Sequence, residues 1–173
     1  MPDGALTEEE AALLLHEAVV TVLSHHHPVA HARITEIKEA VLRLGSARAT
    51  QAWQAVLAGY GELIRSLRHH MHEEEETIFE RVQLFHAKRE LRFGALVKSL
   101  HRIDAMKEEH VELASRLTEL AALRSKLEPE RGDAAERAML HALESFDVAL
   151  VHHSRFEDRV IAPAFRLLAH RVA

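Results

Sequence analysis

Apolar residues recur every three or four positions along four long stretches of this 173-residue chain, and that spacing is the period of an α-helix. The four stretches are residues 15–44, 53–85, 96–120 and 139–168. No alternating apolar and polar pattern, of the kind typical of β-strands, competes with them. Long helices with short connections favour an all-α fold, an antiparallel up-down four-helix bundle formed as a single domain over residues 1–173.

A few residue types mark the expected ends of the helices. Thr7 and Glu10 have the spacing of a capping box that opens the first helix. Pro28 lies inside this helix and should kink it, because its ring removes a backbone donor. We expect breaks at three places where glycine, proline or charge interrupts the apolar stripes: Gly45–Ser46, His86–Arg92 followed by Gly94, and Pro129–Asp133.

The composition excludes several classes of site and partner. The chain has no cysteine, which excludes disulfides, thiolate metal sites and cysteine nucleophiles. Its formal net charge of −5 argues against a nucleic-acid partner, which requires a basic face. There is no apolar run of about 18 residues and no signal-peptide pattern at the start, so we expect a cytoplasmic protein without membrane contact. The unusual feature is the presence of 15 histidines.

Two histidines and two glutamates occupy positions where a bundle normally has leucine. His70 and Glu74 lie seven residues after leucines of the second stripe. His153 and Glu157 lie seven residues after apolar residues of the fourth stripe. In each pair the two side chains are one helical turn apart and share a face. We therefore predict that both pairs point into the bundle.

The first and third stripes contain one such position each. His110 follows Ile103 by seven residues, and His27 follows Val20 by the same interval. Three other histidines have polar residues or glycine at this spacing, so we expect them on solvated faces: His69, His101 and His152.

The same residues repeat along the chain with a constant offset. His27 and His110 are 83 residues apart, as are His70 and His153. Glu74 and Glu157 have this separation too, and so do many apolar residues of the stripes. The pattern predicts two tandem helical hairpins of the same design. It favours His27 as the ligand of the first helix, with His26 and His31 as alternatives because Pro28 distorts the register there.

Six polar groups in an apolar interior need partners. Burying one of them unpaired costs roughly 2–7 kcal/mol, and six would exceed the stability of a typical domain, about 5–15 kcal/mol. Metal ions satisfy such groups directly, and bundles hold them with inward-facing side chains from several helices. The alternative is a metal-free bundle in which the histidines and glutamates hydrogen-bond to one another.

The mixture of imidazole and carboxylate favours iron, with manganese next. Structural zinc sites are closed and tetrahedral, whereas calcium and magnesium prefer oxygen ligands. If two six-coordinate ions share two bridging carboxylates and one solvent oxygen, about ten of roughly twelve positions are filled. About two positions then remain for a small ligand.

The motifs that contain these residues resemble the hemerythrin-like (HHE cation-binding) family. They are His70 to Phe79 (HMHEEEETIF), Glu109-His110, and His153 to Pro163 (HSRFEDRVIAP). The likeness extends over roughly residues 10–168. Within the family the chain is similar to the diiron domain of RIC-type iron–sulfur-cluster repair proteins.

The resemblance implies a hemerythrin-like bundle that binds two non-heme iron ions bridged by carboxylates. It implies terminal ligands and bridges at these positions: His27, His70, His110 and His153 as terminal ligands, and Glu74 and Glu157 as bridges. Oxygen carriers of the family use a fifth histidine in the third-helix motif, where this chain has Ala114. The resemblance therefore favours reaction with oxygen, peroxide or nitric oxide, or iron handling, over oxygen transport.

We therefore expect a diiron protein that reacts with a small diatomic or peroxide ligand, in oxidative or nitrosative stress defence or in iron–sulfur repair. Reduction of peroxide or nitric oxide would make it an enzyme, but the sequence indicates neither an electron donor nor an oligomeric state. Two alternatives stay open. One is a non-catalytic sensor of oxygen or iron, or an iron store, and the other is the metal-free structural bundle.

Overall fold

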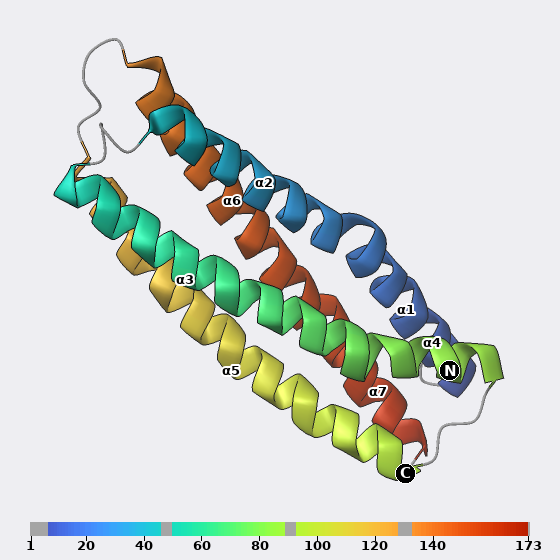
Figure 1. The fold of residues 1–173 in the computed structure, drawn as a ribbon. Coiled ribbons are helices and arrows are strands. Elements are labelled where there is room, and N and C mark those ends of the chain that lie inside the picture. The colour runs from blue at the N-terminus through green and yellow to red at the C-terminus, as the bar shows by residue number, and fades with distance from the viewer. Residues whose placement is uncertain (1–6, 46–49, 89–92, 128–132, 173) are drawn as a thin grey trace, which may run out of the picture.

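The computed structural model describes residues 7–45, 50–88, 93–127 and 133–172, and nearly all of them are helical. The helices are α1 (Glu8–Thr21), α2 (His27–Leu44), α3 (Gln51–Glu74), α4 (Glu80–Lys88), α5 (Phe93–Arg124), α6 (Ala134–Phe156) and α7 (Ala162–Val172). Figure 1 shows them as four rods side by side: α1 with α2, α3 with α4, α5 alone, and α6 with α7. The predicted all-helical class is confirmed, and the rods are consistent with a helical bundle.

Three of the rods contain a single π-helical turn that joins their two α-helices. These turns are η1 (Val22–His26), η3 (Glu75–Phe79) and η4 (Glu157–Ile161). A π-turn adds one residue to a helical turn, and such insertions are frequent at functional sites. Each turn here has one of the predicted polar residues at its end or directly beside it, so the turns affect the direction in which those side chains point.

The η1 turn corrects one step of the sequence analysis. The interval of seven residues from Val20 to His27 predicted that Val20 faces the core, but it is 42% exposed whereas Val19 is fully buried. The inserted residue explains the difference, because eight positions rather than seven separate two core-facing residues across a π-turn. His27 is therefore in register with Val19, and it is buried as expected.

The described ends of the helices agree with the predictions except at one glycine. The Thr7 side chain accepts from the Glu10 backbone amide at 3.2 Å, and the Glu10 carboxylate accepts from the Thr7 amide at 2.7 Å, so the capping box is confirmed. Gly45 ends α2 with a φ of 67°. Gly94 does not break a helix but lies within α5. Ser46, residues 89–92 and residues 129–132 lie outside the described chain.

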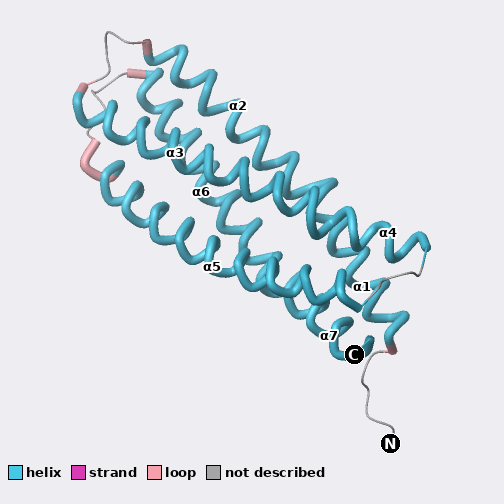
Figure 2. The backbone as a smooth tube through the Cα atoms, turned by 60° about the horizontal axis from the view of Figure 1, so that its bottom comes forward, coloured by secondary structure: helices cyan, strands magenta, loops and turns pink. Residues whose placement is uncertain are grey.

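The apolar core has two parts, with the polar residues between them. One part lies among α2, α3, α6 and the second half of α5, and includes Tyr60 and Phe146. The other lies among α1, α4, α7 and the first half of α5, and includes Phe79 and Phe165. Figure 2 shows the same four rods after rotation, with α1, α4 and α7 together at one end. The two apolar parts therefore cover the polar layer from both ends of the bundle.

Most predicted core residues are buried. Trp53 and Tyr60, predicted as core, are 3% and 1% exposed. Val41, a member of the first stripe, is instead 39% exposed. The side chains of Phe85 and Leu96, also predicted as core, lie outside the described part of the structure.

Candidate metal centre

The six residues predicted from the sequence lie together in the layer between the two apolar parts. They come from all four rods: His27 begins α2, His70 and Glu74 end α3, His110 lies in α5, His153 lies in α6, and Glu157 begins η4. All six side chains are buried, and Glu74 and Glu157 are fully inaccessible to solvent. The prediction that these positions face inward therefore agrees with the structure.

The cluster divides into two overlapping groups of possible metal ligands, each with two histidines and two glutamates. The first group is His70, Glu74, His110 and Glu157. The second is His27, Glu74, His153 and Glu157. Within each group the ligand atoms lie within 4.8 Å of one another. Both glutamates belong to both groups, which is the arrangement that bridging ligands require.

The atoms at the centre of the cluster approach one another without forming a complete hydrogen-bond network. Imidazole Nε2 atoms and glutamate oxygens are 3.0–3.8 Å apart. Among the described residues, both oxygens of Glu74 and of Glu157 lack a hydrogen-bond partner of acceptable geometry, and so do Nε2 of His27 and of His153. Buried polar groups in folded proteins are almost always paired. The donor set, two imidazoles and two shared carboxylates in each group, therefore fits a pair of metal ions.

Three of the four histidines have an ionisable partner on their outer side. His27 Nδ1 lies 2.6 Å from Glu75, His70 Nδ1 lies 2.7 Å from Glu109, and His110 Nδ1 lies 3.0 Å from Asp158. An ionised carboxylate can only accept, so each Nδ1 carries the proton and donates it. The Nε2 lone pair of the neutral ring then points into the cluster, which is the tautomer that a metal ligand needs.

His153 differs from the other three histidines. Its Nδ1 and Nε2 atoms both lack a hydrogen-bond partner within the described chain. The ring of His26 lies 6.3 Å from that of His153, between centroids, and makes no hydrogen bond to it. His153 therefore enters the cluster without a carboxylate behind it.

The pKa values in the metal-free chain follow from burial and from these partners. Burial opposes charge on His70, but the carboxylates of Glu109, Glu157 and Glu74 raise its pKa to about 12. Burial also opposes charge on His27 and His110, and adjacent carboxylates again raise the pKa of each. At His153 burial prevails and lowers the pKa. Without metal, the acidic partners thus favour the protonated form of these three histidines.

The three histidines that were predicted on solvated faces lie there. His69, His101 and His152 are exposed. Of the two alternatives to His27 in the first helix, His31 is exposed, and His26 packs against Phe156 with 4.6 Å between the centroids of the tilted rings. Neither belongs to a group of possible metal ligands in the described chain. The structure therefore places His27, and not His26 or His31, in the cluster.

The sequence analysis missed the outer carboxylates. Glu75 belongs to the acidic run Glu73–Glu76, and its side chain is 43% exposed. A signal was present, because Glu75 and Asp158 are 83 residues apart and each lies 48 residues after a histidine of the cluster. The repeat therefore links these two carboxylates as a pair, although it does not say which ring either one contacts. Glu109 has no such counterpart.

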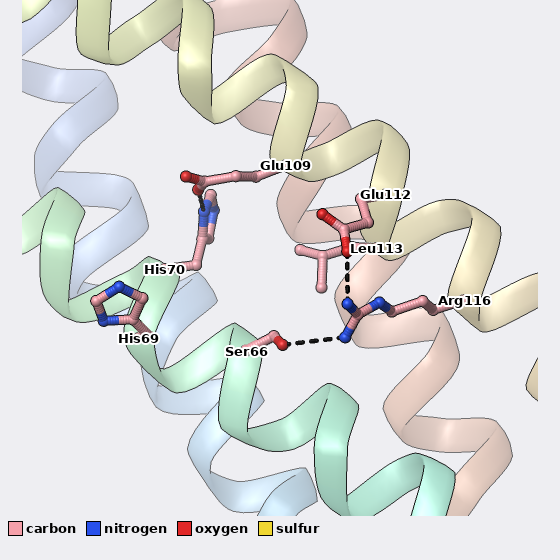
Figure 3. Close-up of a pocket in the computed structure, with 7 residues that line it drawn as sticks. All are labelled: Ser66, His69, His70, Glu109, Glu112, Leu113 and Arg116. Atoms are coloured by element: carbon pink, nitrogen blue, oxygen red, sulfur yellow. Dashed lines mark hydrogen bonds and ion pairs between the residues drawn. The ribbon is translucent and has the colours of Figure 1, made fainter.

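A pocket of about 230 Å³ lies between α3 and α5 beside the cluster. Figure 3 shows its lining, which consists of Ser66, His69, His70, Glu109, Glu112, Leu113 and Arg116. Arg116 spans it by donating to Ser66 and to Glu112. The pocket is lined by His70 and its outer partner Glu109, so it adjoins the cluster on that side.

Comparison of the chain with protein families, with curated proteins and with solved structures found no match. Over the described residues, no helix is long and apolar enough to cross a membrane. A function for this chain is therefore inferred from the geometry of the cluster and not from a relative.

Proposed function

We propose that this chain is a hemerythrin-like diiron protein that reacts with a small ligand such as oxygen, peroxide or nitric oxide. Its four rods form an antiparallel up-down bundle of two tandem hairpins, and its role lies in oxidative or nitrosative stress defence or in iron–sulfur repair. The observation that supports the proposal is the pair of buried ligand groups that share Glu74 and Glu157, whose oxygens have no hydrogen-bond partner of acceptable geometry among the described residues.

The residues divide into three roles. Glu74 and Glu157 would bridge the two ions, since each belongs to both groups. His27, His70, His110 and His153 would each bind one ion through Nε2. Glu75, Glu109 and Asp158 hold three of these rings in the required tautomer and orientation. The two apolar parts of the core keep bulk water away from the ends of the cluster.

The donor count leaves room for chemistry. Four imidazole nitrogens and four carboxylate oxygens are fewer than the roughly twelve positions that two six-coordinate ions offer. When bound, the ions would supply Lewis-acid and electron-transfer chemistry to a small ligand at the positions left over. Iron fits the mixed nitrogen and oxygen set, with manganese as the next candidate.

Metal analysis of the purified chain, with an electronic spectrum, tests the proposal. We expect about two iron ions per chain, because there are two ligand groups. Glu74→Ala and Glu157→Ala should lose iron, whereas His69→Ala and His152→Ala, which change exposed residues of the same rods, should retain it. Iron loss in the His69 variant equal to that in the Glu74 variant would contradict the assignment. A chain that binds no metal and keeps its helicity and melting temperature with a chelator would support the structural bundle instead.

Addition of peroxide or nitric oxide to the iron-loaded chain separates the roles. Sustained turnover with an added electron donor would identify an enzyme. A single stoichiometric oxidation would identify a sensor or an iron store. The spectrum before and after reduction reports both outcomes.

A further inference from the structure

The two halves of the cluster are related by the 83-residue repeat, but their surroundings are not the same. On one side, Glu109 accepts from His70 Nδ1 at 2.7 Å (Figure 3). The residue 83 positions earlier than Glu109 is His26, and the repeat partner of His70 is His153. His26 makes no hydrogen bond to His153, whose Nδ1 has no partner among the described residues. The repeat therefore holds for the inner ligands and fails for this outer contact.

The difference extends one layer further out. Arg102 donates to both oxygens of Glu109, at 2.6 and 3.3 Å, and its Nε lies 3.8 Å from Glu73. The repeat partner of Arg102 is Val19, which is fully buried, and the repeat partner of Glu73 is Phe156. Phe156 packs against His26 with 4.6 Å between ring centroids. A charged network thus supports His70, whereas His26, which packs against Phe156, lies 6.3 Å from the ring of His153 and makes no hydrogen bond to it.

This difference changes the ligand strength of the two histidines. A carboxylate that accepts from Nδ1–H fixes the ring and increases the basicity of Nε2, and its loss typically costs 10–100-fold in metal affinity. The group of His70 and His110 has two such partners, Glu109 and Asp158. The group of His27 and His153 has one, Glu75. The positive charge of Arg102 does not cancel the difference. Glu73 and Glu109 carry two negative charges, so the network of three residues keeps a net charge of −1.

We propose that the two metal positions are inequivalent: the position of His70 and His110 fills first and binds its ion more tightly, and the position of His27 and His153 fills second and releases its ion first. This inference rests on the proposed function, since it concerns the same two ions. We expect the two dissociation constants to differ by about 10–100-fold, the usual effect of one outer carboxylate.

An anaerobic titration of the metal-free full chain with Fe²⁺, followed by calorimetry and by competition with a chelator of known affinity, tests this order. The wild-type chain should bind in two resolved steps of one ion each. His26→Glu places a carboxylate at the repeat equivalent of Glu109 and should tighten the second step toward the first. Its control is His25→Glu, which makes the same change of charge at an exposed neighbour and should leave the ratio of the two constants unchanged.

Glu109→Gln tests the same order from the other side. It should weaken the first step by about 10–100-fold and so bring the two constants together. Glu108→Gln, an exposed neighbour on α5, is its control. Circular dichroism checks the helicity of each variant, and if His26→Glu does not fold, the Glu109 comparison decides alone.

The outcomes distinguish the two proposals. Two ions bound with equal constants, or equal effects of His26→Glu and His25→Glu, would overturn the inequivalence and leave the diiron site intact. Failure of Glu109→Gln to weaken the first step would also overturn it. A wild-type chain that binds no metal would overturn both the inequivalence and the diiron function.

Discussion

The Nε2 atoms of His70 and His110 lie 3.1 Å apart inside the cluster. Both rings donate from Nδ1 to an outer carboxylate, so in their neutral forms both Nε2 atoms carry a lone pair. Two lone pairs at this distance repel each other unless a proton or a metal ion lies between them. The metal-free chain therefore holds a proton at a place that the proposed ions would occupy.

The first prediction concerns release of this proton. The pKa of His70 in the metal-free chain is raised to about 12, so the ring is protonated at neutral pH. A metal ligand must give up its proton, so binding should release protons and tighten as the pH rises. Calorimetric titrations at pH 7 in buffers of different ionisation enthalpy measure the number released. We expect at least about one proton per cluster, and a value of zero would contradict the protonated state of His70.

The second prediction concerns the stability of the metal-free chain. A group whose pKa is higher in the folded state stabilises the fold fully below its unfolded pKa, and this contribution is lost as the pH rises through the folded value. For His70 these values are 6.5 and about 12, although burial alone would act in the opposite direction. Urea unfolding should therefore show a free energy that falls between pH 6.5 and the alkaline limit of the measurement. In His70→Ala this part of the slope should disappear, and an unchanged slope would contradict the assignment.

The third prediction concerns removal of the metal. Ions that bind only the folded chain stabilise it, by about 2.7 kcal/mol at a free concentration 100 times the dissociation constant. A chelator should therefore lower the melting temperature of the wild-type chain, measured by circular dichroism. The double variant Glu74→Gln and Glu157→Gln lacks both shared ligands, so the chelator should not change its melting temperature. A similar decrease in both proteins would show that the metal binds elsewhere.

The fourth prediction concerns an outer carboxylate that is equivalent in both halves of the repeat. Glu75→Gln replaces the carboxylate that accepts the hydrogen bond from His27 Nδ1 with a neutral amide. The affinity for metal should fall about 10–100-fold, while the helicity is retained. Glu76→Gln is the matched control, since it changes the neighbouring exposed glutamate. Chelator competition measures both. If the two variants weaken binding alike, then general charge and not the contact with His27 is responsible.

The fifth prediction separates stability from metal binding. Tyr60 donates to Asp147 at 2.9 Å, and Arg124 donates to both of these residues. Asp147→Ala leaves the tyrosine hydroxyl and the guanidinium without this acceptor, which should destabilise the fold by about 1–3 kcal/mol. The metal content should be unchanged, because none of these residues belongs to the cluster. His141→Ala, an exposed change on the same helix, is the control for chemical denaturation.

The inner ligands were predictable because burial leaves a periodic trace in the sequence. His70, Glu74, His153 and Glu157 interrupt apolar stripes at intervals of seven, and the 83-residue offset links each residue of one hairpin to its partner in the other. Burying a polar residue at a core position costs free energy of folding. Its recurrence at equivalent positions of the two hairpins therefore indicates that both residues serve the same function. The same spacing argument predicted His27 as an inward-facing residue. The residue is buried, but the interval used to predict it was wrong. The interval from Val20 is not the relevant one, because the η1 turn inserts a residue.

The outer partners could not be chosen from periodicity in the same way. Glu75, Glu109 and Asp158 lie near the surface, where acidic residues cost little and are common, so their positions carry no hydrophobic signal. Only the packing of the rods shows which carboxylate meets which ring.

By itself, the sequence determined the helical class and the inward-facing histidines and glutamates, because both depend on local periodicity and on the cost of burial. The tertiary structure alone decided how those side chains combine into two groups that share Glu74 and Glu157. It also decided that His153, unlike the other three histidines, has no described carboxylate hydrogen-bonded to its Nδ1. These relations join residues on different rods, and contacts between distant segments depend on packing in three dimensions that no interval along one helix specifies.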